Sequence, residues 1–378
     1  MAMQLRRFNR ISLTTVVIAG LLLVLIPQLA AAQEERLKLS SATPETLRQA
    51  GAAKHVIVGA AADPRHLSET DYASTLAAQF AQLEPENQMK FQVIHPGPGS
   101  DASSYDFSPA DKLVAFAEAH NMKVRGHCFV WHQQLPAWLT AGVKNHEYDA
   151  AALNTILQEH ISAVAKHYAG KVWAWDVVNE AFDADGTMRS TVWYDAPGIG
   201  FAGKSTTYIE RAFIWAHAAD LNAKLFYNDY DAEPINAKSD AIYAMAKDFR
   251  SRAVPLDGIG FQAHINLTFD DPATLDAFAA NLKRFSDLGL EIHITELDIA
   301  LDDNTPASLQ RQGELYRKVA ETCLQNPSCR VLQTWGLTDR YSWIPSYSKG
   351  KQGWALPFDA EYQKKPAYDG ELRALRGK

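Results

Sequence analysis

Two glutamates stand at the ends of two apolar, strand-like runs. Glu180 closes the run Val172–Glu180 (VWAWDVVNE), and Glu296 lies within Glu291–Ile299 (EIHITELDI). Both runs are rich in aromatic and β-branched residues, which is typical of buried strands. A single carboxylate in such a place is equally well explained by a salt bridge at the rim of a sheet. Two of them, far apart in sequence, are the pair of carboxyl groups that glycoside hydrolysis uses, if the fold brings them face to face.

Strand-like and helix-like segments alternate along the chain and must position this pair. Eight apolar runs predict strands at His55–Ala61, Gln82–Glu86, Lys123–Val130, Val172–Asn179, Lys224–Asn228, Gly258–Ile265, Glu291–Leu297 and Val331–Gly336. Of these, the second run is the least apolar. Segments with helical periodicity follow at Ala73–Gln79, Pro109–His120, Ala150–Tyr168, Thr206–Leu221, Lys238–Arg250, Pro272–Asp287, Pro306–Gln325 and Lys365–Leu375.

Eight alternating units predict a single (β/α)8 TIM barrel, in which the carboxyl ends of all strands meet at one face. An open, doubly wound sheet is the alternative, but no glycine-rich phosphate loop follows the first strand. The sequence shows no Pro/Ser-rich linker, low-complexity tract or internal repeat. We therefore expect one catalytic domain over residues 33–378 and no appended carbohydrate-binding module.

The first 32 residues have the pattern of a signal peptide. Arg6, Arg7 and Arg10 give a positive start, Ile11–Ile26 is apolar, and small residues precede a cleavage site near Ala32. The apolar stretch is short for a membrane span, which needs about 20 residues. We expect a secreted or periplasmic protein, with an uncleaved anchor as the alternative.

The cysteines and histidines predict a disulfide and no metal site. Cys323 and Cys329 bracket a turn-like QNPS loop, so a local disulfide is plausible in an exported protein, whereas Cys128 lies in an apolar run and should be buried. No Cys/His cluster has zinc-site spacing, and no carboxylate spacing accompanies His127 and His132. We therefore expect neither a metal nor an organic cofactor.

The overall charge narrows the class of partner. The formal net charge is -7, and no dense Lys/Arg stripe follows the N-terminal segment. This argues against nucleic acid as a partner. We also expect no membrane partner beyond the signal segment, and we expect a monomer.

Further polar and aromatic clusters follow other predicted strands. They are Glu86–Lys90 (ENQMK), Gly126–His132 (GHCFVWH), Gly260–His264 (GFQAH) and Thr334–Trp343 (TWGLTDRYSW). Taken singly, each has a structural explanation: a solvated loop, a buried histidine, polar filling of a barrel, or packing of a lid. Aromatic faces at a strand end can also stack on sugar rings.

Together these motifs, with Trp175–Glu180 and Ile294–Asp298, resemble glycoside hydrolase family 10, the retaining endo-β-1,4-xylanases. The resemblance runs from about Glu45 to Leu375, and the motifs occur in the family's order. The departures are small. Cys128 and Phe129 stand where Thr-Leu is common, and Phe91 replaces a frequent Trp; these changes concern the shape of the sugar subsites.

The resemblance implies a role for each matching residue. Glu180 becomes the general acid/base and Glu296 the nucleophile. The residues expected on the glycone side of the cleft are Glu86, Asn87, Lys90, Gln134 and Trp343. Those expected around the sugar at the reaction centre are His127, Trp131, Asn179, Gln262, His264 and Trp335, with Tyr230 on the leaving-group side.

The resemblance therefore implies a secreted endo-β-1,4-xylanase that acts on xylan or xylo-oligosaccharides by double displacement. Two alternatives remain. A related retaining β-1,4-glycanase acting on glucan or mixed substrates would share the paired glutamates. A barrel that only binds glycans would have no use for both of them, and both are present.

Overall fold

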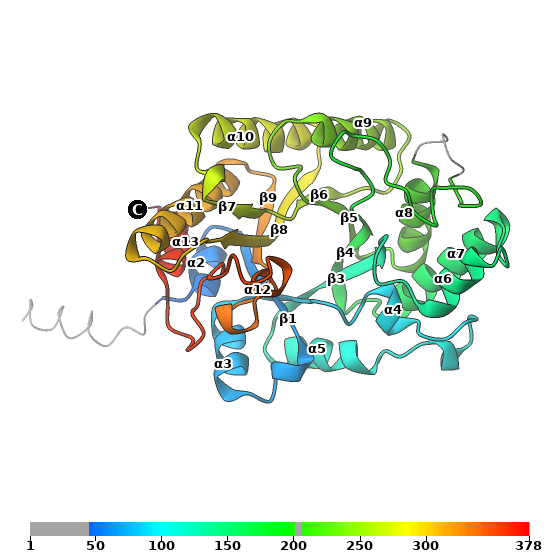
Figure 1. Cartoon of the computed structure of the whole chain (residues 1–378), viewed down its shortest axis with the longest axis horizontal. Coiled ribbons are helices and arrows are strands. Elements are labelled where there is room, and N and C mark those ends of the chain that lie inside the picture. Colours follow the sequence, from blue (N-terminus) through cyan, green and yellow to red (C-terminus); the bar gives the residue numbers. More distant parts are fainter. Residues whose placement is uncertain (1–44, 201–205, 378) are drawn as a thin grey trace, which may run out of the picture. The chain divides into compact units, whose positions relative to one another are not determined.

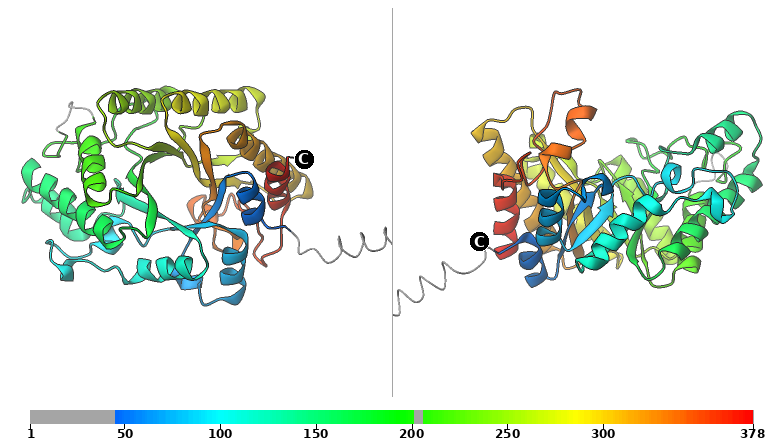
Figure 2. Two further views of the ribbon diagram at one scale, coloured as in Figure 1. Left: turned by 180° about the vertical axis from the view of Figure 1, so that it is seen from behind. Right: turned by 90° about the horizontal axis from the view of Figure 1, so that it is seen from below.

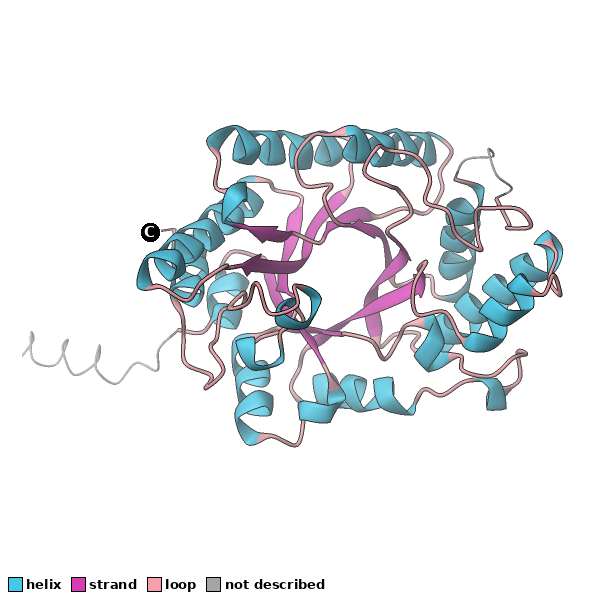
Figure 3. Ribbon diagram, in the orientation of Figure 1, coloured by secondary structure: helices cyan, strands magenta, loops and turns pink. Residues whose placement is uncertain are grey.

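Eight parallel strands close into a ring in the computed structural model, which describes residues 45–200 and 206–377 (Figures 1 and 3). Each strand pairs with the next, β6 pairs with β8, and β9 returns to β1; β7 adds a short extension along β8. The strands are β1 Ile57–Ala62, β2 Gln82–Pro85, β3 Lys123–Val130, β4 Val172–Asn179, β5 Lys224–Asp229, β6 Gly258–Phe261, β7 His264–Asn266, β8 Glu291–Ala300 and β9 Cys329–Thr334.

Helices surround this ring, as Figure 1 shows. They are α2 Leu47–Ala53, α3 Thr70–Gln79, α4 Phe91–Ile94, α5 Ser108–Ala119, α6 Ala137–Lys144, α7 Ala150–His167, α8 Thr207–Ala219, α9 Ala237–Ser251, α10 Pro272–Asp287, α11 Pro306–Gln325, α12 Ile344–Tyr347 and α13 Pro366–Arg376. In the side view of Figure 2, α6 and α12 project at the same end of the barrel. The predicted (β/α)8 fold is confirmed.

One predicted strand is wrong. The run Gly258–Ile265 forms two strands rather than one, because Ala263 takes a left-handed backbone conformation (φ 59°) that an extended strand excludes. After this bend, β7 continues along the far end of β8. Sequence periodicity cannot detect a single residue of this kind.

Other differences concern segments outside the regular repeat. The prediction missed α2, which precedes the first strand, and α6, which lies between β3 and α7. It also began α3 three residues late. The predicted second strand ends at Pro85, so Glu86 lies in the loop that follows. These segments lack the long apolar periodicity on which the prediction rests.

The barrel has an apolar shell and a polar interior. Between strands and helices lie large buried side chains such as Leu113, Phe213 and Phe285. Inside the ring, by contrast, Arg125 of β3 donates to His293 of β8 across 2.8 Å. Since β3 and β8 are not neighbours in the ring, their side chains meet only across its interior.

The structure also tests the predicted disulfide and the predicted burial of Cys128. Cys323 and Cys329 are joined by the predicted disulfide, and Cys128 is buried with a free thiol. A search of the described helices finds none with the length and apolarity to span a membrane. The predicted signal segment, residues 1–32, lies outside the described residues.

The last helix, α13, packs on α11 through two glycines. A Cβ added to Gly370 would collide with the backbone oxygen of Gly313, and backbone cannot yield as a flexible side chain can. We predict that Gly370→Ala lowers the free energy of unfolding by about 1–3 kcal/mol, measured by denaturant unfolding. Gly353→Ala is the control, because its Cβ would meet only Pro345 at 3.6 Å. Equal stability of the two variants would contradict this account of the packing.

Candidate active site at the mouth of the barrel

One of the two glutamates directly follows the carboxyl end of β4, and the other lies in the carboxyl half of β8. Glu180 directly follows β4 and is 8% exposed, while Glu296 lies within β8 and is 3% exposed. The backbone of Glu180 is left-handed, with φ 57°. For a residue other than glycine this costs on the order of 1–2 kcal/mol, and such strain concentrates at functional sites.

A chain of amide groups joins the two carboxyl groups. Gln262 Nε2 donates to Glu180 Oε1 at 3.0 Å and to Asn179 Oδ1 at 3.1 Å. Asn228 Nδ2 donates to the same Asn179 oxygen at 3.0 Å and to Glu296 Oε1 at 2.7 Å. The four strands that carry these residues therefore bring the glutamates to one site, as the sequence predicted.

Glu296 is held on its other oxygen by histidine. His264 Nε2 lies 3.0 Å from Glu296 Oε2, and its Nδ1 lies 3.0 Å from Asp298 Oδ2. Burial opposes charge on this ring, but the two carboxylates outweigh it and raise the pKa of His264 well above its ordinary value. Burial would raise the pKa of Glu296, yet the hydrogen bond from His264 leads the effects that lower it. Glu296 is therefore kept ionised.

Glu180 has a different environment. Its Oε2 accepts a hydrogen bond of 2.8 Å from Trp131 Nε1, and the His132 ring nitrogen lies 3.8 Å away. Asn179 Nδ2 donates to Oε1 at 3.2 Å. The two glutamates thus differ in their partners: Glu296 contacts a charged donor, whereas the hydrogen bonds to Glu180 come from neutral donors.

Aromatic rings and one lysine surround the carboxyl pair. Lys90 Nζ lies 4.6 Å from the Trp131 ring and 5.5 Å from the Trp335 ring. Trp343 donates from Nε1 to Asp298 Oδ2 at 2.8 Å, and its ring is 5.1 Å from that of His264. The indole rings are therefore fixed by hydrogen bonds and by cation–π contact, which suits them to hold a sugar ring.

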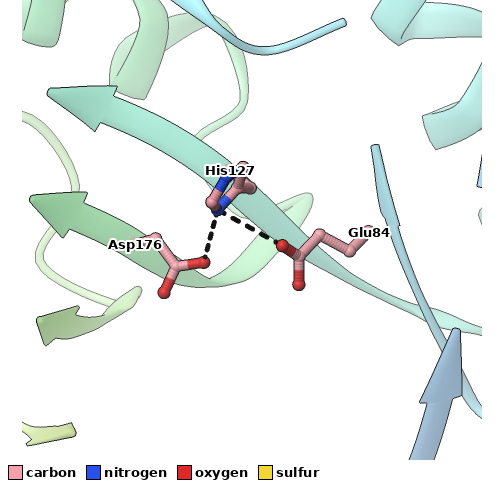
Figure 4. Close-up of side chains that lie close together, drawn as sticks. All are labelled: Glu84, His127 and Asp176. Carbon is pink, nitrogen blue, oxygen red and sulfur yellow. Dashed lines mark hydrogen bonds and ion pairs between the residues drawn. The ribbon is translucent and has the colours of Figure 1, made fainter. Parts of the chain in front are cut away.

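Below this layer, His127 lies between two carboxyl groups from the neighbouring strands, as Figure 4 shows. Its Nδ1 is 3.0 Å from Asp176 Oδ2 and 3.3 Å from Glu84 Oε1. A lone pair on Nδ1 would repel both carboxyl groups, so Nδ1 carries a proton and Nε2 is left to bind a ligand. The centroid of the His127 ring lies 5.4 Å from that of Trp335.

The same three residues have the donor set of a metal site, which bears on the prediction that no metal is bound. The sequence argument rested on the absence of carboxylates near His127, and that argument was incomplete because Glu84 and Asp176 come from adjacent strands. The chain itself provides a cation here, however. Arg125 donates to Asp176 from Nε at 3.0 Å, and it lies 3.4 Å from Glu84. The residues present therefore do not fit an additional metal ion.

The remaining predicted residues lie around this centre. Asn87 Oδ1 accepts from Lys90 Nζ at 3.2 Å and from Gln134 Nε2 at 3.0 Å, which joins these three into one group. For Glu86, no hydrogen bond joins the side chain to the other site residues in the described part of the chain. Burial, followed by the Asp63 carboxylate, raises the pKa of Glu86 to about 7, and the positive charge of Lys90 opposes this rise.

Tyr230 reaches the site through an intermediate residue. Arg189 donates from Nη2 to the Tyr230 hydroxyl at 3.0 Å and from Nε to the Glu180 backbone oxygen at 2.9 Å. Lys238 Nζ lies 3.6 Å from the Tyr230 ring. No pattern in the sequence pointed to Arg189, because it lies in an irregular loop.

The sequence pointed to some residues without revealing their contacts. Asn228 is a polar residue at a predicted strand end, where a barrel places its active site, but its bridge between Asn179 and Glu296 was not predicted. Asp298 was part of a recognised motif, yet its contacts with His264 and Trp343 depend on the tertiary structure. Nothing in the sequence distinguishes three further residues from ordinary strand residues, because they contact one another only inside the closed barrel: Glu84, Arg125 and Asp176.

A closed (β/α)8 barrel with two buried carboxyl groups at its mouth, linked by amides and flanked by indole rings, is the arrangement of a glycoside hydrolase. The chain belongs to glycosyl hydrolase family 10, whose sequence profile matches residues 46–374. The family predicted from the motifs is confirmed.

Individual relatives agree with this assignment. The chain is 45% identical over 299 residues to endo-1,4-beta-xylanase B of Thermotoga neapolitana, covering 79% of this chain and 81% of that protein. It is 39% identical over 335 residues to endo-1,4-beta-xylanase C of Phanerodontia chrysosporium, covering 88% and 78%. Xylanase 10B of Thermotoga petrophila RKU-1, solved in complex with xylobiose, superposes with a TM-score of 0.81 at 42% identity, covering 89% and 98%.

The His264–Asp298 contact generates a prediction on pH dependence. In Asp298→Asn, His264 loses a charge that raises its pKa, so Glu296 loses a charged donor and its pKa rises. The nucleophile is then protonated at higher pH, and we expect the acidic limb of the kcat/KM profile to move to higher pH. The control is Asp276→Asn, an exposed residue of α10. An acidic limb that stays in place would show that Asp298 does not act through His264.

Proposed function

We propose that the chain is an exported, retaining endo-β-1,4-xylanase that hydrolyses internal xylosidic bonds of xylan. The observation that carries this proposal is the pairing of Glu180 and Glu296 through one amide chain in a family 10 barrel. Its relatives named as endo-1,4-beta-xylanases support the substrate. Residues 1–32 have the pattern of a signal peptide, which supports export.

In this proposal Glu296 is the nucleophile. Its ionised carboxylate attacks the anomeric carbon, forming a glycosyl ester while the bond to the leaving oxygen breaks. Glu180 begins protonated and transfers its proton to that oxygen. In the second step Glu180 removes a proton from water, and the resulting hydroxyl replaces Glu296 at the anomeric carbon. The two inversions give net retention.

The residues around the pair are suited to bind the sugar at the reaction centre. Asn179 is held by Gln262 and Asn228 and can present its amide to the hydroxyl next to the anomeric carbon, where a hydrogen bond strengthens in the transition state. His127, fixed by Asp176, offers its free Nε2. No step requires a metal or cofactor, and we propose that the enzyme acts as a monomer.

The direct test of the nucleophile is Glu296→Ala. We expect loss of xylan hydrolysis by at least a factor of about 10³ with the fold unchanged, because no other group can form the ester. Added azide should restore part of the turnover and yield an α-glycosyl azide, identified by NMR. Activity close to that of the unaltered enzyme would exclude Glu296 as the nucleophile.

A glucan-cleaving enzyme is the second candidate, since one relative at 35% identity is named "Exoglucanase XynX". It comes from Acetivibrio thermocellus, and the match spans 28% of that protein. We favour xylan because Trp343, fixed by its bond to Asp298, can limit the room beside C5, where glucose carries a hydroxymethyl group.

The limited room beside C5 of the bound sugar predicts a preference for xylan over cellulose. We expect xylan to be hydrolysed on the order of 10–200 times faster than carboxymethyl-cellulose, the range that one additional small group commonly gives. Trp343→Ala should reduce this ratio. The control is Tyr347→Ala, because Tyr347 contacts Trp343 but is 74% exposed. Equal rates on both polymers with the unaltered enzyme would favour the glucanase.

A further inference from the structure

A second groove lies on the outside of the barrel, between α7 and α8. Its volume is about 530 Å³. The residues that line it include Asn154, Thr155, Gln158, Ile199, Arg211 and Trp215. In Figure 1 these two helices run side by side. None of these residues takes part in the hydrogen bonds around Glu180 and Glu296, so the groove is separate from the site described above.

Trp215 gives the groove an aromatic surface. Its ring is half-buried and packs against the apolar shell, so its position is fixed from one side. No hydrogen bond from its indole N–H is found among the described residues. A fixed, partly exposed indole with a free donor combines an apolar face with a polar group, the combination that sugar rings require.

Amide and hydroxyl groups adjoin this ring. Gln158 is exposed, and within residues 45–200 and 206–377 its side-chain amide has no hydrogen-bond partner. Thr155 donates to the Ala151 backbone oxygen at 3.1 Å, which leaves its own oxygen able to accept. These groups can donate to and accept from sugar hydroxyls, each of which is both a donor and an acceptor.

Arg211 adds a positive charge. It donates to Asn154 Oδ1, which orients the guanidinium plane. No ion pair of Arg211 with a carboxylate occurs in the described part of the chain, and none of the groove-lining residues is acidic. In a protein with net charge -7, an uncompensated arginine in a groove favours a ligand that carries a carboxylate, which it can bind through two parallel hydrogen bonds.

We propose that this groove is a second binding site for β-1,4-xylan whose side groups are uronic acids. Trp215 stacks on a backbone xylose, Gln158 and Thr155 bind hydroxyls, and Arg211 binds the uronate. The proposal rests on the proposed function, because it takes the polymer that the barrel mouth cleaves. A long acidic chain is then held at two places, whereas a short substrate engages the barrel mouth alone.

The test compares one short substrate with two polymers. With an aryl β-xylobioside, Arg211→Ala and Trp215→Ala should keep the kcat/KM of the unaltered enzyme, because neither residue lies at the barrel mouth. With glucuronoxylan, we expect each variant to raise KM roughly fivefold, the size of one stacking or ionic contact. With neutral arabinoxylan, Trp215→Ala should raise KM while Arg211→Ala leaves it unchanged.

Leu221→Ala is the matched control, since Leu221 is exposed beyond the end of α8 and does not line the groove. If Trp215→Ala fails to fold, as judged by circular dichroism, the exposed Gln158→Ala replaces it, with the same expected rise in KM for both polymers. Unchanged KM for glucuronoxylan in the groove variants would overturn the site, and an equal effect of Arg211→Ala on both polymers would overturn the uronate contact. Failure of the unaltered enzyme to cleave the aryl xylobioside would instead refute the proposed function.

Discussion

The structure depends on compensating several buried carboxyl groups inside one barrel. Arg125, wholly buried, supplies the central positive charge: it bonds to Asp176, lies beside Glu84 and reaches across the ring to His293. Burial and the Asp176 carboxylate raise the pKa of Glu84, whereas Arg125 and His127 overcome burial and lower that of Asp176. Removing one partner of such a pair typically costs about 3–5 kcal/mol, so this interaction constrains β2, β3, β4 and β8, the strands that carry Glu84, Arg125, Asp176 and His293.

The surroundings of Glu180 and Glu296 give these two glutamates different chemical properties. Glu296 contacts His264, itself charged through Asp298, and is thereby kept ionised. The described hydrogen bonds to Glu180 come from the neutral donors of Trp131, Asn179 and Gln262. Different environments for paired carboxyl groups are how one site provides both an acid and a nucleophile. The amide chain between them fixes their relative position while leaving this difference intact.

Much of this could be predicted from the sequence, because apolar periodicity and strand-end residues are local. The alternation gave the barrel, and Glu180, Glu296, Asn179 and Trp131 follow from the motifs at strand ends. Features that depend on a single backbone angle or on contacts across the ring could not be read in this way. Ala263 splits a predicted strand, and Arg125 contacts His293 only once the ring has closed. The groove residue Trp215 reads as an ordinary core position of a helix.

The central claim is that Glu296 forms a covalent intermediate that Glu180 then helps to hydrolyse. The stereochemistry of the first product tests it most directly, since double displacement retains the anomeric configuration and single displacement inverts it. Proton NMR of xylo-oligosaccharide hydrolysis, recorded before mutarotation, should show the β anomer first and the α anomer only later. Initial appearance of the α anomer would contradict the account, because water would then have displaced the leaving group without a glycosyl-enzyme.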